Sequence, residues 1–127
     1  MTTAVTPRVE YEERFAARPD LMKAAEAALA YLDGRLGTDP LVPPPSLIRW
    51  ALRPLDPNSV ELSMADEDRG LRAVDVFPAR YLADPQTRDL QTTGVWGDLL
   101  AERSRANQKR IDEKFRAYFR SLEDDPE

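Results

Sequence analysis

The stretch Ile48-Arg49-Trp50-Ala51-Leu52-Arg53 decides the fold, because its large apolar residues recur at every second position. This spacing is typical of a β-strand that buries one face. Residues 60–64 repeat the pattern, and a third run follows at residues 73–77. Turn-forming residues separate the runs at 56–58 and at 68–70. The sequence therefore predicts a three-stranded antiparallel meander in the middle of the chain.

The two turns also predict which residues pair. A three-residue loop whose last residue, Gly70, takes the left-handed conformation is a common hairpin connection. We expect a similar loop ending at Asn58 to join the first two strands. A slip by one residue would turn every side chain to the other face of the sheet. The pairs expected from these loops are Met64 with Val74, Leu62 with Val76, Asp66 with Arg72, Leu52 with Leu62, Trp50 with Met64, and Arg53 with Glu61.

Helices are predicted before the meander. Thr6, a capping residue, stands before a proline, which suits the first position of a short helix over residues 7–17. A second start at Pro19 precedes apolar residues at helical spacing, and Gly34 or Gly37 is expected to end this helix.

The C-terminal third is predicted to contain one helical turn at residues 79–82, a polar loop at 86–94 and a long helix from about residue 95 to 122. At 1.5 Å per residue this helix is about 40 Å long, more than a chain of this size needs. Trp96 is expected in the core at the start of the helix, with an interface anchor as the alternative. The inward line of the helix is expected to be Trp96, Leu100, Arg103, Asn107, Ile111, Phe115, Tyr118 and Leu122.

The predicted fold class is α+β. N-terminal helices precede a three-stranded antiparallel β-meander, and the long C-terminal helix packs on one face of the sheet. A length of 127 residues suits one domain over residues 1–127. We expect residues 1–6 and 123–127 to fray.

Composition excludes several classes of function. The chain has no cysteine and no histidine, which excludes thiol catalysis, imidazole acid/base chemistry and zinc sites built from these ligands. It has no run of eighteen apolar residues, and residues 1–5 show no signal-peptide pattern, so we expect a cytoplasmic protein with no membrane association. The acidic residues Asp66, Glu67 and Asp68 lack the alternating spacing of a calcium loop. We expect no cofactor, no metal and no catalytic residue.

Large apolar residues occupy both ends of the long helix but are missing from residues 101–110. One interpretation is that the distal residues dock on the N-terminal helices. Another is that they overhang the body and bind a partner protein or a second copy. In a third interpretation, Arg103 and Asn107 line a polar slot. The candidate partner-binding residues are Ile111, Phe115, Tyr118, Phe119 and Leu122.

The same helix is locally basic, with seven Lys or Arg between Arg103 and Arg120. The net charge of the whole chain is −5, however, and argues against nucleic acid as a partner. The function we expect is a non-enzymatic protein–protein interaction module, as a small subunit or adaptor of a larger assembly. One alternative is a nucleic-acid-binding accessory protein that uses the basic helix face. The other is a small enzyme that depends on carboxylates or arginine. A ligand-binding role for the loop at 86–97 also stays open.

Overall fold

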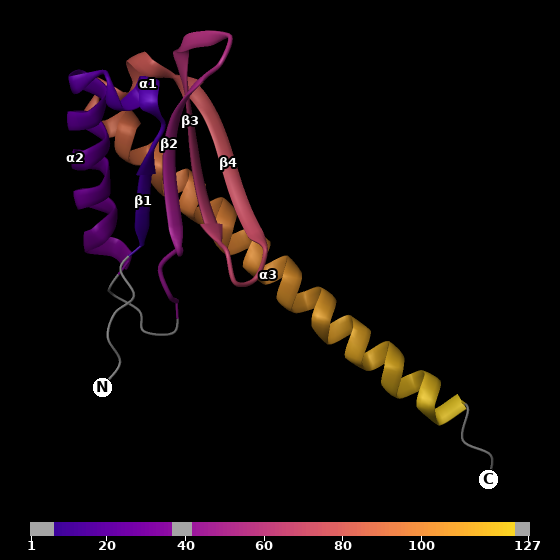
Figure 1. Ribbon diagram of the computed structural model, residues 1–127. Helices are drawn as coiled ribbons and strands as arrows, with labels where there is room; N and C mark the ends of the chain where they lie inside the picture. Colours follow the sequence, from indigo (N-terminus) through magenta and orange to yellow (C-terminus); the bar gives the residue numbers. More distant parts are fainter. Residues whose placement is uncertain (1–6, 37–41, 124–127) are drawn as a thin grey trace.

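A four-stranded mixed sheet with strand order β1-β2-β3-β4 forms the centre of the molecule (Figure 1). The computed structural model describes residues 7–36 and 42–123. The predicted α+β class is confirmed, with a fourth strand added to the expected three. The elements are β1 (Arg8–Tyr11), α1 (Glu13–Ala16), α2 (Pro19–Leu36), β2 (Leu47–Arg53), β3 (Asp56–Asp66), β4 (Leu71–Pro78), the 3-10 helix η1 (Ala79–Leu82) and α3 (Pro85–Glu123).

The helix expected over residues 7–17 is wrong, because the first part of this range forms strand β1. β1 pairs in parallel with β2, and places Val9 opposite Ile48 and Tyr11 opposite Trp50. Val9 and Tyr11 pack against the core, so their spacing of two outweighs the helix-start signal. The cap expected at Thr6 lies outside the described residues. The helix here is the single turn α1, at whose start the carboxylate of Glu12 accepts a hydrogen bond from the Arg14 N–H.

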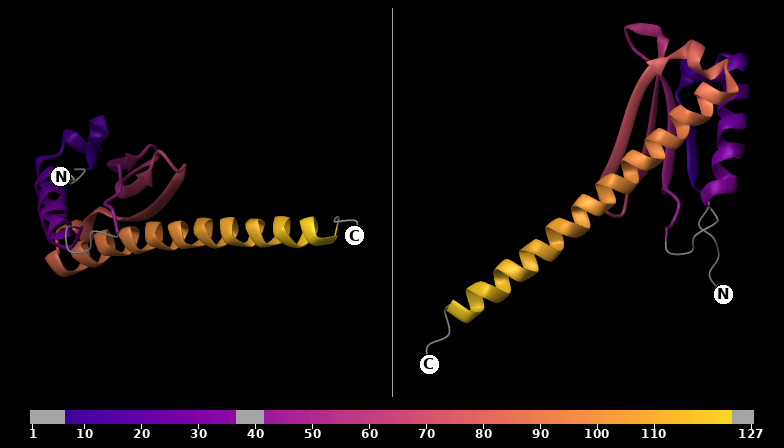
Figure 2. Two further views of the ribbon diagram at one scale, coloured as in Figure 1. Left: turned by 90° about the horizontal axis from the view of Figure 1, so that it is seen from below. Right: turned by 180° about the vertical axis from the view of Figure 1, so that it is seen from behind.

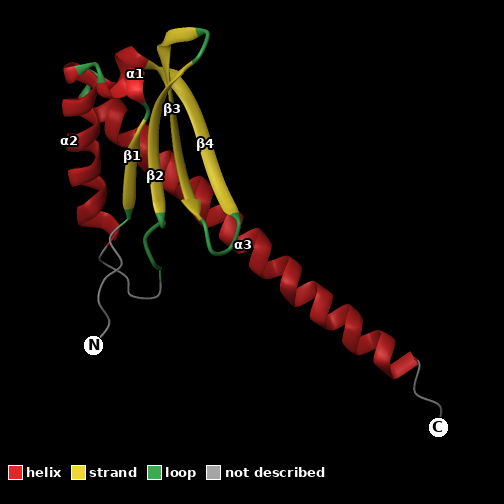
Figure 3. Ribbon diagram, viewed as in Figure 1, coloured by secondary structure: helices red, strands yellow, loops and turns green. Residues whose placement is uncertain are grey.

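One face of the sheet carries the core. Alternate residues of β2 and β3 are buried against the apolar sides of α2 and of the first half of α3. Figure 3 shows α3 crossing behind the strands, and Figure 2 shows the same helix from two other sides. The core members from these four elements are Leu21, Ala25, Ala28, Leu32, Leu36, Ile48, Trp50, Leu52, Val60, Leu62, Met64, Val95, Trp96 and Leu99.

The expected register of the second hairpin is wrong by one residue. Asp66 pairs with Leu71, so the loop has four residues rather than three, although Gly70 does take a positive φ of 67°. Met64 therefore lies opposite Ala73 and not Val74. The shift turns Val74 outward with 43% of its surface exposed, whereas Ala73 is buried. Val76 follows Val74 to the open face, and Phe77 takes the core position in its place.

The first hairpin is shifted by two residues, which leaves the buried face unchanged. Its turn is Pro54-Leu55, and a bulge between Leu52 and Arg53 makes Arg53 pair with Asp56 instead of Glu61. Upstream of the bulge, Leu52 pairs with Val60 and Trp50 with Leu62, whereas Leu62 and Met64 were expected.

Helix α3 begins ten residues earlier than expected. The carboxylate of Asp84 accepts hydrogen bonds from the Thr87 hydroxyl at 2.6 Å and from the Thr87 N–H at 3.4 Å. The hydroxyl contact above all lowers the pKa of Asp84. Pro85 then occupies the first helical position, where its missing N–H costs nothing. The loop expected at 86–94 is therefore wrong, because Asp84 and Pro85 start a helix as well as ending η1.

Other predictions for the helices are confirmed. α2 begins at Pro19, η1 covers residues 79–82, and Trp96 belongs to the core with 8% of its surface exposed. The expected fraying falls outside the described residues except at Glu123, which is the last residue of α3.

The β3–β4 register can be tested by two neighbouring substitutions. Phe77→Ala removes a buried ring and is expected to lower the free energy of unfolding by about 3–5 kcal/mol. Val76→Ala, on the open face, is expected to lower it by less than about 1 kcal/mol. Urea denaturation of both variants and the wild type measures the difference, and a larger loss for Val76→Ala would contradict the observed register.

Candidate functional site

Helix α3 continues far beyond the body of the molecule. Its 39 residues make a rod of about 60 Å, and the second half projects past the sheet into solvent (Figure 2). We call residues 104–123 the arm. The described residues before it, 7–36 and 42–103, are the body. Every residue from Asn107 to Glu123 is exposed. From Asn107 onward, therefore, no described residue of the arm is buried.

Five large apolar side chains lie on this arm, and we call them the distal patch. Their exposed fractions range from 39% for Ile111 to 59% for Tyr118. The ring centroids of Phe115 and Phe119 are 6.5 Å apart, and those of Tyr118 and Phe119 are 5.7 Å apart. The aromatic rings thus contact one another, with no cover from the body. The distal patch consists of Ile111, Phe115, Tyr118, Phe119 and Leu122.

These exposures decide between two of the interpretations of the long helix. The prediction that the distal patch docks on the N-terminal helices is wrong. Helix α2 packs beside the first half of α3, and the arm projects away from α2. The patch overhangs the body instead.

The distal patch does not continue the side of α3 that faces the body. The buried residues of α3 are Thr92, Val95, Trp96 and Leu99. At about 100° per residue, the mean direction of these residues and that of the distal patch differ by about 130° around the helix. The expected inward line faces the body only as far as Arg103, because Asn107 and every later residue on it are exposed.

Charges surround the distal patch. Asp112 accepts a hydrogen bond from Gln108 at 3.0 Å, and Arg105 forms an ion pair with Glu102 one turn earlier. The basic residues of the arm are Arg105, Lys109, Arg110, Lys114, Arg116 and Arg120, and its acidic residues are Asp112, Glu113 and Glu123.

Arg103 anchors α3 to the sheet at the point where the helix leaves the body. Its Nε and Nη2 atoms lie 2.5 Å and 2.7 Å from the two carboxylate oxygens of Asp66, a bidentate pair. Nη1 donates to the Pro43 carbonyl at 2.8 Å, and the guanidinium lies 5.0 Å from the centroid of the Trp96 ring. Asp66 was expected to face Arg72, which instead contacts Glu61 at 3.4 Å.

A groove of about 630 Å³ lies at the base of the arm, next to this anchor. Arg103 and Asn107 both line it, so the two residues of the expected polar slot do share one hollow. Arg103 is already bound to Asp66, whereas Asn107 is exposed. The other lining residues are Val42, Pro43, Asp68, Arg69, Leu71, Leu100, Ser104, Ala106 and Arg110.

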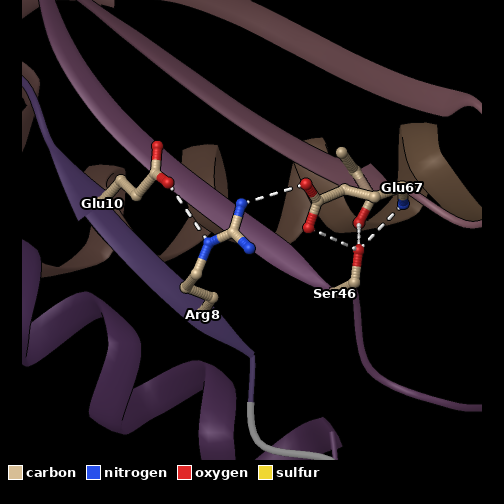
Figure 4. A network of polar contacts seen from close by, with 5 residues as sticks. Arg8, Glu10, Ser46 and Glu67 are labelled. Carbon is tan, nitrogen blue, oxygen red and sulfur yellow. Dashed lines mark hydrogen bonds and ion pairs between the residues drawn. The ribbon is translucent and has the colours of Figure 1, made fainter.

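The acidic run at residues 66–68 divides among different partners. Asp66 contacts Arg103, whereas Glu67 contacts Arg8 of β1 at 3.0 Å, and its backbone N–H donates a hydrogen bond to the Ser46 hydroxyl at 2.9 Å (Figure 4). Arg8 also contacts Glu10 at 3.2 Å. This network ties β1 to the end of β3. Across residues 7–36 and 42–123, no three acidic side chains converge in a way that could hold a metal ion.

Comparisons with known proteins found no match to this chain. No protein-family model matches it, and neither a curated protein nor a solved structure matches it significantly. None of the helices in the described part of the chain is both long and apolar enough to cross a bilayer.

Sequence reasoning found the apolar residues of the distal patch and two residues of the groove, Arg103 and Asn107, but it missed the anchor. The patch is visible as apolar residues at helical spacing after a polar gap. The pairing of Arg103 with Asp66 joins residues 37 positions apart, and the sequence gives no local signal for it. The one available hint is that Arg103 takes an apolar position on the expected inward line.

The anchor can be tested by removing one partner and then both. Arg103→Met leaves the buried Asp66 carboxylate without its cation and is expected to lower the free energy of unfolding by about 3–5 kcal/mol. The double variant Asp66→Leu/Arg103→Met is expected to regain most of this loss, because no unpaired charge remains. Urea denaturation measures both. Arg105→Met, which breaks an exposed pair, is the control and is expected to cost less than about 1 kcal/mol.

The anchor would be contradicted if Arg103→Met and Arg105→Met had the same free energy of unfolding, or if the double variant were less stable than Arg103→Met.

Proposed function

We propose that this protein is a non-enzymatic protein–protein interaction module, a small subunit or adaptor that binds its partner through the arm of α3. The observation that carries the proposal is the distal patch, five large apolar side chains at least 39% exposed on a helix that projects from the body. An exposed apolar cluster with polar residues around it is typical of a binding surface.

The stability of the arm supports the same proposal. Isolated helices of fewer than about 12–15 residues are marginal in water, and longer ones still draw most of their stability from packing of an apolar face. The arm has twenty residues, and every residue of its apolar face is exposed. Aromatic residues are also poor helix formers compared with alanine or leucine. A protein partner that covers the distal patch would supply the missing packing energy.

The composition of the patch suits a protein partner in particular. Tyrosine, phenylalanine and arginine are enriched in the centres of protein interfaces. Tyr118 and Phe119 lie at the middle of the arm's apolar stripe, and Arg116 and Arg120 lie beside it in the sequence. We also propose a cytoplasmic location, which a chain without cysteine permits.

A nucleic-acid-binding role is the second candidate, because the arm holds six basic residues against three acidic ones. Two features favour protein over nucleic acid. The basic residues are spread around the helix, and the stripe that would face a ligand is apolar. The net charge of −5 also opposes approach to a phosphate backbone. We expect no binding of labelled duplex or single-stranded nucleic acid at physiological salt.

Site-specific photo-crosslinking in the native cell tests the proposal. With a photo-reactive phenylalanine analogue at position 118, we expect a covalent adduct to a protein, either another chain or a second copy, because this position lies within the distal patch. The same analogue at position 113, about 140° away from position 118 around the helix, is the matched control and is expected to give little adduct. Equal yields at the two positions, no adduct at either, or adducts to nucleic acid would contradict the proposal.

A further inference from the structure

We infer that the partner of the distal patch is a second copy of this chain, bound by antiparallel pairing of the two arms. This inference rests on the proposed function and names its partner. Four observations support it: the spacing of the patch, the distribution of charge along the arm, the apolar area that is available, and the groove at the base of the arm.

The spacing of the patch is that of a two-helix seam. Ile111, Phe115, Tyr118 and Leu122 follow one another at intervals of four, three and four residues. This is the alternation of positions d and a in the heptad repeat of coiled coils, in which each side chain fits between four residues of the facing helix. Phe119 widens the seam on one side. A seam of this kind fits another helix better than a flat or concave surface.

The arm is suited to an antiparallel partner because its base is basic and the sequence that follows it is acidic. The base contains Arg105, Lys109 and Arg110, whereas Glu123 is followed in the sequence by Asp124, Asp125 and Glu127. Antiparallel pairing places the basic base of each arm beside the acidic end of the other. Parallel pairing would place like charges together at both ends.

The seam favours one alignment. When Phe115 of one arm is level with Tyr118 of the other, Ile111 is level with Leu122, so apolar residues meet along the whole seam. This layering of position a on position d is the arrangement of an antiparallel pair of helices. Arg110 and Glu123 of the second copy lie at the same level but outside the seam.

Arg110 and Arg69 both line the groove at the base of the arm. Neither arginine forms an ion pair within the described parts of the chain. Antiparallel pairing brings the acidic end of the second arm to this groove. The acidic residues of each copy then lie near the unpaired arginines of the other.

The available area suits such a dimer. Aromatic side chains offer about 150–250 Å² each, so the half-exposed distal patch contributes on the order of 500 Å² per copy. Two copies then bury about 1,000 Å², which is at the lower limit for a specific interface. Antiparallel pairing also holds the two bodies at opposite ends of arms about 30 Å long. This separation matters because residues 1–103 carry seventeen acidic residues against twelve basic ones.

Sedimentation equilibrium of the full chain provides the first test. We expect a dimer at about 100 μM, a concentration at which a complex with a Kd near 10 μM is mostly formed. Phe115→Glu is expected to raise the dissociation constant at least about 30-fold, as for a central interface residue. Glu113→Gln, on the other side of the arm, is the matched control and is expected to leave the dimer intact. Circular dichroism checks that both variants remain folded.

Disulfide trapping tests the orientation of the two arms. Because the sequence has no native cysteine, only the introduced cysteines can form disulfides. Ile111→Cys and Leu122→Cys are prepared on separate chains and oxidised alone and as a mixture. Antiparallel arms are expected to form a disulfide between the two different chains in the mixture, with little bonding in either variant alone. Disulfide formation by each variant alone would show parallel arms and overturn the inference.

A monomer at about 100 μM would also overturn the inference. Photo-crosslinking at position 118 then separates the two proposals. An adduct to a different protein would leave the proposed function standing with another partner, and no adduct would end both.

Discussion

Arg103 and Asp66 form the contact on which the shape of the molecule depends. The pair joins the end of β3 to α3 at the last turn of the helix that touches the body, and both side chains are largely buried. The same guanidinium binds the carbonyl of Pro43 and lies against Trp96. Because a bidentate pair fixes both position and angle, it sets the direction in which α3 leaves the sheet. The arm and the groove at its base both follow from that direction.

Two halves of one helix therefore have different physical roles. The half from Pro85 to Arg103 is held by its cap at Asp84 and by buried side chains such as Leu99. The arm lacks such contacts, and its apolar side lies about 130° around the helix from the side that faces the body. The arm is thus stable as a helix to the extent that another protein packs against it.

The sequence predicts β2, β3, β4 and α2 correctly, as well as the run of apolar residues on the arm, because each depends on local periodicity. It fails where a few residues compete. At residues 67–70 a loop of four residues rather than three reverses which valines face the core. At Asp84-Pro85 the same dipeptide ends one helix and starts another, so a polar stretch that looks like a loop forms two turns and more of α3. β1 and the Arg103–Asp66 pair depend on partners 37 or more residues away, which no local pattern reveals.

Hydrogen–deuterium exchange along α3, measured at several protein concentrations, tests the central claim most directly. Amides from Val95 to Arg103 are expected to stay protected at every concentration, because they belong to the folded body. Amides from Arg105 to Glu123 are expected to exchange quickly in dilute protein and to gain protection as concentration rises, since pairing of the arms stabilises the helix. If the arm exchanged at the same rate at all concentrations while the body stayed protected, the second copy would not be what the arm binds.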